Sequence, residues 1–109
     1  MQKRTKATSI PPKIRHEVEL RDSVNGVPRC IFCGSPDCRG EAHFIRRSQG
    51  GLGIPQNLVT ACRTCHAMFD EGKEKDAYRK IARDYLKSKY PDWKEEDLIY
   101  NKWKGFKFQ

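Results

Sequence analysis

The sequence predicts a single α+β domain, in which a strand–loop–strand–helix core is held by four cysteines and flanked by N- and C-terminal helices. Three observations lead to this class. Two Cys-x2-Cys pairs bracket the middle of the chain, two short apolar runs lie between them, and an amphipathic helical pattern follows them. A chain of 109 residues fits one domain, 1–109, and it shows no internal repeat and no linker.

The first part of the chain predicts an arm, a helix and a turn. Residues 1–11 are polar and basic, which is typical of a flexible arm. The stretch "PPKIRHEVELRDS" (11–23) predicts a short helix, because Pro12 suits a first helical turn and apolar residues recur along one side. Asn25 followed by Gly26 indicates a turn.

A β-hairpin and a helix are predicted across the middle of the chain. "EAHFIRR" (41–47) has strand character, and "LVTA" (58–61) is a second short strand. The glycine-rich loop 48–57 is long for a connection between paired strands, and such loops are often functional. "RTCHAMFDEG" then begins a helix that should end near Gly72.

The C-terminal region, 73–109, is predicted to be helical. Apolar residues recur at helical spacing over 73–90 and basic residues fill the other face, which indicates an amphipathic helix covering the core. Pro91 ends this helix. "DWKEEDLIYNKW" (92–103) predicts one more short helix, with Asp92 as its cap.

Four of the five cysteines have the spacing of a structural zinc site. They are Cys30, Cys33, Cys62 and Cys65. Each Cys-x2-Cys pair offers two thiolates to one side of a metal, so two pairs close a tetrahedral Zn²⁺ site around the core, 30–72. Because no coordination position stays open, this zinc should fold the protein, with a contribution on the order of 10 kcal/mol, and should not catalyse. Cys38 lies outside the paired pattern and is interpreted as free.

The charge favours a polyanionic partner. The chain has 22 basic and 14 acidic residues and a net charge of +8. Nucleic acid is the first candidate partner, although a basic surface without such a partner explains the same composition. No run approaches the roughly 18 apolar residues of a transmembrane helix, and the N-terminus lacks the apolar segment of a signal peptide. We therefore expect no membrane association and a reducing cytoplasm, where cysteines serve as ligands.

Two histidines, an asparagine and an aspartate remain unexplained by a zinc site. His66 and Asp70 are four apart on the predicted helix, so they could share a second metal. Taken alone, a hydrogen bond on a solvated helix face explains this pair better. His43 on the predicted strand and Asn57 at the loop end add a fixed order, His–Asn–His, framed by the cysteine pairs. A structural zinc does not account for that order.

The stretch "CIFC…EAHFIRRSQGGLGIPQNLVTACRTCHAMFD" resembles the small phage-type HNH endonucleases with a four-cysteine zinc site. The resemblance runs from residue 30 to about residue 72. It implies a ββα-metal (His-Me finger) core, in which a β-hairpin and a helix hold one divalent cation. It also implies metal-dependent hydrolysis of phosphodiester bonds in double-stranded DNA, as nicks or double-strand cuts. A phage-encoded protein in a bacterial host cell, with the terminase of DNA packaging as a partner in some relatives, belongs to the same expectation.

The resemblance further implies the roles of the three motif residues. His43 would be the general base, His66 would ligate the catalytic divalent cation (Mg²⁺, Mn²⁺, Ni²⁺ or Co²⁺), and Asn57 would order the loop and orient His43 by hydrogen bonding. This sequence departs from the family at Ala42, because many relatives have a metal-ligating residue before the base. Asp70 is our candidate for completing the metal site, since some relatives use a residue four after the last motif histidine.

Several basic and acidic residues are secondary candidates. Glu41 shares a strand face with His43 by alternation, so it is a weaker candidate ligand or tunes the base. Arg46, Arg47 and Arg63 border the predicted site and are candidate phosphate contacts. Other basic residues could contact phosphates or could be ordinary solvated charges. These are Lys3, Arg4, Lys6, Lys13, Arg79, Lys80 and Arg83.

Two other functions stay open on the sequence. A non-catalytic zinc-ribbon module that binds nucleic acid explains the cysteines and the charge, but not the ordered His43, Asn57 and His66. A degenerate HNH scaffold, inactive because Ala42 removes a ligand, explains all of these residues.

Overall fold

The computed structural model describes the backbone of residues 3–100, and it confirms the α+β class. At its centre, strand β3 (Cys38–His43) pairs with strand β4 (Leu58–Cys62) in an antiparallel ladder. The register places Cys38 opposite Cys62 and His43 opposite Leu58, with an irregularity between Arg39 and Ala42. The hairpin therefore carries one cysteine ligand and one motif histidine at opposite ends.

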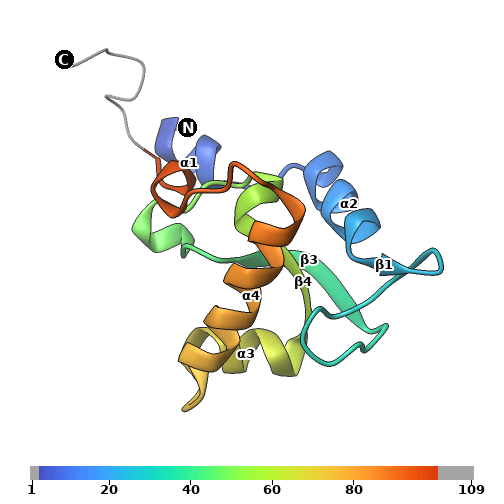
Figure 1. Ribbon diagram of the computed structural model, residues 1–109. Helices are drawn as coiled ribbons and strands as arrows, with labels where there is room; N and C mark the ends of the chain where they lie inside the picture. The colour runs from blue at the N-terminus through green and yellow to red at the C-terminus, as the bar shows by residue number, and fades with distance from the viewer. Residues whose placement is uncertain (1–2, 101–109) are drawn as a thin grey trace.

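Helices cover this hairpin on both sides (Figure 1). Helix α2 (Pro12–Arg21) contacts both β3 and β4, and its first residue is the predicted proline. Helix α3 (Arg63–Glu71) follows β4 without a loop and ends before Gly72, as predicted. Helix α4 (Lys75–Lys89) packs against α3 and ends before Pro91. The strand–loop–strand–helix order of the predicted core is therefore confirmed.

The first strand of the hairpin is displaced from its predicted range. The sequence predicted 41–47, whereas β3 begins at Cys38 and ends at His43. One backbone bond continues the pairing, from Phe44 N to Asn57 O at 2.8 Å, and the next amide, Ile45 N, bonds to the Asn57 side chain at 2.8 Å. The side chain of Asn57 thus takes the place of the next backbone hydrogen bond of the ladder. The strand therefore ends before the position that the sequence predicted.

The prediction of a flexible arm at 1–11 is wrong within the described residues. Helix α1 (Lys3–Thr8) forms there, and its C-terminal end docks on the loop between β3 and β4. Ala7 accepts a backbone hydrogen bond from Gly53 N at 3.0 Å, and Thr8 is buried. The polar composition of this segment hid the docking, because the contacts are hydrogen bonds and not an apolar face.

The turn predicted at Asn25 and Gly26 is present. Strands β1 (Ser23–Val24) and β2 (Val27–Pro28) form a small hairpin around Asn25 and Gly26, whose positive φ angles of 53° and 80° fit a two-residue turn. The loop 48–57 contains parts of two 3₁₀ turns, η1 (Arg47–Gln49) and η2 (Pro55–Asn57).

The prediction of a short helix at 92–103, capped by Asp92, is wrong within the described residues. The structure has a 3₁₀ turn, η3 (Glu95–Leu98), preceded by Lys94, and no cap bond comes from a side chain there. Residues 101–109, including the end of that prediction and of the C-terminal region, lie outside the described residues.

No helix in the described range has the length and apolar character needed to cross a bilayer.

One apolar core joins the hairpin to α3, α4 and η3. Phe44, Phe69, Leu86 and Leu98 are each at most 1% exposed. Phe44 lies between the ring of Trp93, edge-on at 5.6 Å, and the guanidinium of Arg79 at 4.4 Å. The residue directly after His43 is therefore fixed in the core, which limits how far the end of β3 can move.

A buried polar network ties α2 to the hairpin and to α4, and the sequence analysis missed it. Asp22, 5% exposed, accepts hydrogen bonds from Arg21, from Thr60 N at 2.9 Å and from the Tyr85 hydroxyl. Arg21 also donates to Leu58 O at 2.7 Å. Burial lowers the pKa of Arg21, but its bond to Asp22 outweighs that effect and raises the pKa above its ordinary value.

Asp22→Ala is expected to destabilise the fold by about 3–5 kcal/mol, because it leaves the partly buried Arg21 charge without its carboxylate partner. Chemical denaturation measures this change. Asp92→Ala, at an exposed aspartate, is the control and should stay within about 0.5 kcal/mol of wild type. Equal stabilities of the two variants would contradict the role of the network.

Candidate functional site

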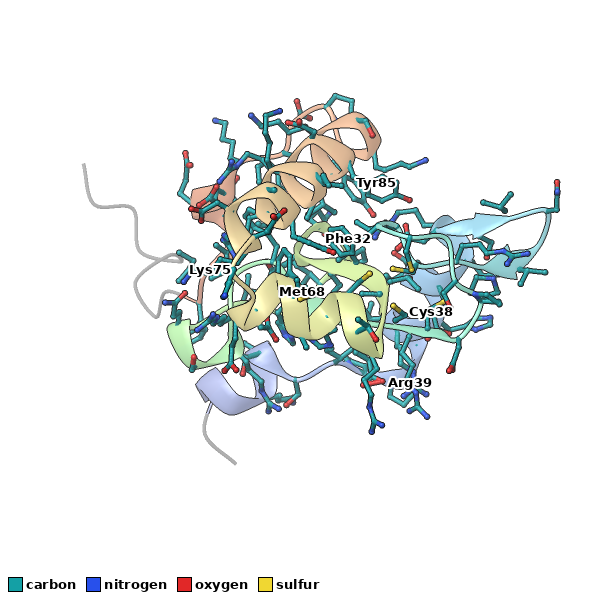
Figure 2. The ribbon with its side chains drawn as sticks, turned by 90° about the horizontal axis from the view of Figure 1, so that it is seen from below. Phe32, Cys38, Arg39, Met68, Lys75 and Tyr85 are labelled. Atoms are coloured by element: carbon teal, nitrogen blue, oxygen red, sulfur yellow. The ribbon has the colours of Figure 1, made fainter. Side chains whose placement is uncertain are left out.

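Four cysteines from three segments converge on one point. Cys30 and Cys33 lie in the turn after β2, Cys62 ends β4, and Cys65 is in the first turn of α3. Their Sγ atoms all lie within 4.8 Å of one another, and the Cys33 and Cys62 sulfurs are 3.6 Å apart. Sulfur atoms gather between Phe32 and Cys38 in Figure 2. Tetrahedral zinc with Zn–S bonds of about 2.3 Å separates its sulfurs by about 3.8 Å, so the four thiols fit that ion.

The thiols of this cluster have opposed pKa shifts. Burial raises the pKa of Cys30, but backbone hydrogen bonds from Cys62, Cys33 and Phe32 outweigh it and lower the pKa to about 7. Burial and the neighbouring thiols raise the pKa of Cys65. Four sulfurs this close cannot all ionise without a cation between them, which supports a structural zinc.

Cys38 lies outside this cluster. The set of four ligand atoms excludes it, and its Sγ donates to Pro36 O at 3.7 Å. None of the five cysteines forms a disulfide. The prediction that four cysteines form the cluster and that Cys38 is free is confirmed.

The two motif histidines and Asp70 line one hollow. The hollow has a volume of about 330 Å³. Its lining comprises Glu41, His43, Arg46, Arg47, Ser48, His66, Asp70 and Glu71. His43 comes from the end of β3, whereas His66 and Asp70 come from α3. Strand β4 leads directly into α3 at Cys62, which is one of the four clustered cysteines. This junction holds α3 next to the β3–β4 hairpin, so side chains from both line the hollow.

His66 and Asp70 form the pair expected from their spacing. His66 Nε2 and Asp70 Oδ2 are 3.2 Å apart, and both side chains are more than one-third exposed. One imidazole and one carboxylate offer two ligands to a cation. Among the residues that the structure describes, three or more candidate ligands come together only at the cysteines.

His43 is half-buried. Its Nε2 lies 3.0 Å from Thr8 O. Burial lowers the pKa of His43; the hydrogen bond to Thr8 O opposes this effect, the positive charge of Arg47 adds to it, and the net pKa lies below the ordinary value. The neutral imidazole is therefore favoured near neutral pH, which is the form a general base needs.

The two residues before His43 face opposite sides of β3. Ala42 is 1% exposed and belongs to the core, so neither its chemistry nor its direction suits a metal ligand. Glu41 lies on the same side as His43 and also lines a second, adjoining hollow of about 650 Å³. Its Oε1 is buried and accepts no hydrogen bond from the described residues, but the guanidinium groups of Arg39 and Arg15 lie 3.7 and 3.9 Å away.

Asn57 holds the loop and not the ring of His43. Its Oδ1 accepts from Ile45 N, and its Nδ2 donates to Ile45 O at 3.2 Å and to Leu52 O at 2.8 Å. The expected hydrogen bond between Asn57 and the His43 side chain is absent, and Thr8 supplies that bond instead. Because Asn57 is fully buried, it acts as a positioning residue for the turn after β3.

The three candidate phosphate-binding arginines have different surroundings. Arg46 donates to the carbonyl of Asp70 at the end of α3, and Arg47 donates to the hydroxyls of Thr8 and Ser9 at 3.1 and 2.7 Å. Both line the smaller hollow. Arg63 is exposed in the larger hollow. Arg63 is therefore the least constrained of the three in this structure.

The three candidate phosphate-binding residues of α4 have partners within the protein. Arg79 donates to Phe44 O at 2.9 Å, Lys80 pairs with Asp84 at 2.8 Å, and Arg83 pairs with Glu95 at 3.4 Å. They are better explained as packing and surface charges than as phosphate contacts. The side chains of Lys3 and Arg4 lie outside the described residues.

Comparison with known proteins gives one family and one partial relative. Residues 30–69 match the family model described as HNH endonuclease. The chain is also similar to a DnaJ homolog subfamily A member 1 homolog from Dictyostelium discoideum, with 39% identity over 41 residues, or 38% of this chain. The chain spans 9% of the length of that curated relative. No solved structure matches the chain at a significant level.

Proposed function

From the HNH endonuclease domain in residues 30–69, we propose that this protein is a metal-dependent endonuclease that hydrolyses phosphodiester bonds of double-stranded DNA. The observation that carries the proposal is the shared hollow, which His43 lines together with the His66–Asp70 pair. A zinc-binding module without catalysis has no need of a half-buried neutral histidine opposite a second ligand pair.

Hydrolysis of a phosphodiester bond has three requirements, and residues of β3 and α3 that line the hollow would meet them. The attacking water must lose a proton, the charge on the phosphate must be neutralised, and the leaving oxygen must be stabilised. His43, on β3, accepts the proton of the water. His66 and Asp70, on α3, would hold a divalent cation, which supplies charge neutralisation at the phosphate and the leaving oxygen when bound.

The residues present fit such a cation in type. An imidazole and a carboxylate suit Mn²⁺, Co²⁺ and Ni²⁺ as well as Mg²⁺. Ala42 supplies nothing, so Glu41, which lines the same hollow, is the candidate for a further ligand or for a residue that tunes His43. Two fixed ligands also leave positions for phosphate oxygens and water.

The partner and setting extend the same proposal. The net charge of +8 and the arginines around the hollows, Arg63 above all, favour DNA phosphates, and affinity should fall steeply with salt. We infer weak sequence specificity, since the candidate contacts are to phosphates. The resemblance to phage-type members supports a bacteriophage origin, the bacterial cytoplasm as location, and the terminase as a partner in DNA packaging.

The alternative is a non-catalytic zinc-ribbon module that binds nucleic acid. Ala42 favours it, because the family's usual ligand at this position is missing. Conversion of supercoiled plasmid separates the two functions. The endonuclease nicks or linearises the plasmid with Mg²⁺, Mn²⁺ or Ni²⁺ and not with EDTA, whereas the module leaves it intact.

Asp70→Asn is expected to raise the Mn²⁺ concentration needed for half-maximal cleavage by about 10–100-fold, because it removes a charged ligand. Titration of plasmid cleavage with Mn²⁺ measures the shift. Asp84→Asn is the matched control, since Asp84 also forms an i,i+4 pair on an exposed helix face. An unchanged metal response in Asp70→Asn would remove Asp70 from the cation site.

A further inference from the structure

The N-terminal segment reaches the ring of the proposed general base. Thr8 O lies 3.0 Å from His43 Nε2, and Thr8 is 2% exposed. A carbonyl oxygen accepts hydrogen bonds and never donates, so the Nε2 atom of a neutral His43 carries the proton. The lone pair of the imidazole is then on Nδ1. A hydrogen bond at this distance requires that tautomer and orients the ring towards Thr8 O.

Independent contacts hold this carbonyl in place. Gly53 N donates to Ala7 O at 3.0 Å, on the residue before Thr8. Arg47 donates to the Thr8 hydroxyl at 3.1 Å and to the Ser9 hydroxyl at 2.7 Å. Gly53 and Arg47 both belong to the connection between β3 and β4, so the segment is tied to the loop that follows His43. Figure 1 shows α1 beside this loop.

The approach of the segment to the loop requires a glycine. A Cβ on Gly53 would lie 1.9 Å from Ser9 O and 2.7 Å from Ser9 C, which no packing tolerates. The contact is with backbone and cannot be relieved by a side-chain rotation. Gly53 therefore allows the docking of residues 7–9, and a larger residue there would displace them.

We propose that the segment Ala7–Ser9 positions His43, so that the Thr8 carbonyl holds Nε2 protonated and leaves Nδ1 to accept the proton of the attacking water. The segment lies outside the residues matched by the family, 30–69. A positioning residue for the base thus comes from a separate part of the chain. The assignment of Nδ1 as the base rests on the proposed function, whereas the tautomer does not.

The tautomer is tested by long-range ¹H–¹⁵N correlation spectra of the full, zinc-loaded chain at a pH where His43 is neutral. The chain has three histidines, and the His43 resonances are identified by their loss in His43→Gln. Wild type is expected to show the Nε2-protonated pattern. In Gly53→Ala the pattern should shift towards a mixture of tautomers. A wild-type ring protonated at Nδ1, or an unchanged pattern in Gly53→Ala, would overturn the proposal.

Arg47→Gln provides a second variant in case Gly53→Ala does not fold. It removes both bonds to the segment without adding a clash, and it should also broaden or mix the tautomer pattern. Arg46→Gln is the matched control, because it removes a charge from the same hollow but has no bond to the segment. Its His43 pattern should equal that of wild type. The same change of pattern in both arginine variants would contradict positioning by the segment.

The effect of the segment on catalysis is measured by comparing kcat and KM between wild type and Gly53→Ala. Gly53→Ala, if folded and zinc-loaded, is expected to lower kcat by up to about 100-fold with KM for DNA little changed. An unchanged or increased kcat would mean that the segment covers the site and does not assist it. If wild type cleaves no DNA at all, the proposed function fails, and the tautomer spectra still decide whether the segment holds His43.

Discussion

Cys65→Ser is expected to leave the core, 30–72, without a stable fold. The four sulfurs lie within 4.8 Å of one another, and Cys65 is 5% exposed. Replacing its thiol by a hydroxyl removes a zinc ligand. Because the position is buried, a water molecule cannot take its place. Structural zinc contributes on the order of 10 kcal/mol to the folding of small domains. Whole domains have a stability of about 5–15 kcal/mol, so the loss is comparable with the total.

Zinc content and thermal unfolding by circular dichroism measure this effect. Wild type should hold one zinc per chain and unfold cooperatively, whereas Cys65→Ser should hold less zinc and show no cooperative transition. Chelation of wild type should give the same result. Cys38→Ser is the matched control, because Cys38 lies outside the cluster, and it should keep the zinc and the transition. A folded, zinc-loaded Cys65→Ser would show that the cluster does not carry the fold.

His43→Gln is expected to lower the cleavage rate by about 10²–10⁴-fold, the usual contribution of a general base. Glutamine keeps the polar end and can still donate a hydrogen bond to Thr8 O, but it cannot take a proton near neutral pH. DNA affinity should change little, because His43 is neutral and half-buried. Single-turnover cleavage at saturating DNA and Mn²⁺ measures the rate.

His16→Gln is the control for this change. His16 is exposed on α2 and lines neither of the hollows described above. It should cleave at the wild-type rate. A similar loss in both variants, or full activity in His43→Gln, would remove His43 from the role of general base.

The core could be predicted because its pattern is local. Two Cys-x2-Cys pairs specify one metal site by spacing alone, and the helical period of 73–90 is long enough to predict α4. The turn at Asn25 and Gly26 follows from the positive φ angles that these residues tolerate. Each of these predictions depends on residues that are close in sequence.

The contacts between distant residues could not be predicted. Thr8 contacts His43 across 35 positions, and Asp22 contacts Tyr85 across 63. Single hydrogen bonds of this kind leave no periodic pattern in the sequence. The displaced β3 has the same cause, since the side chain of Asn57, at the end of η2, replaces the next bond of the ladder. Asn57 was predicted to order the loop and to orient His43, and its side-chain bonds go to Ile45 and Leu52.

Cleavage of supercoiled plasmid by zinc-loaded wild type and His43→Gln, side by side in EDTA, Mg²⁺, Mn²⁺ and Ni²⁺, tests the central claim most directly. Metal-dependent nicking or linearisation by wild type, lost in His43→Gln, is the predicted result. It would establish the endonuclease and its base together. An intact plasmid with every metal, from a folded and zinc-loaded wild type, would contradict the claim and favour a zinc-binding module in which Ala42 has replaced an essential ligand.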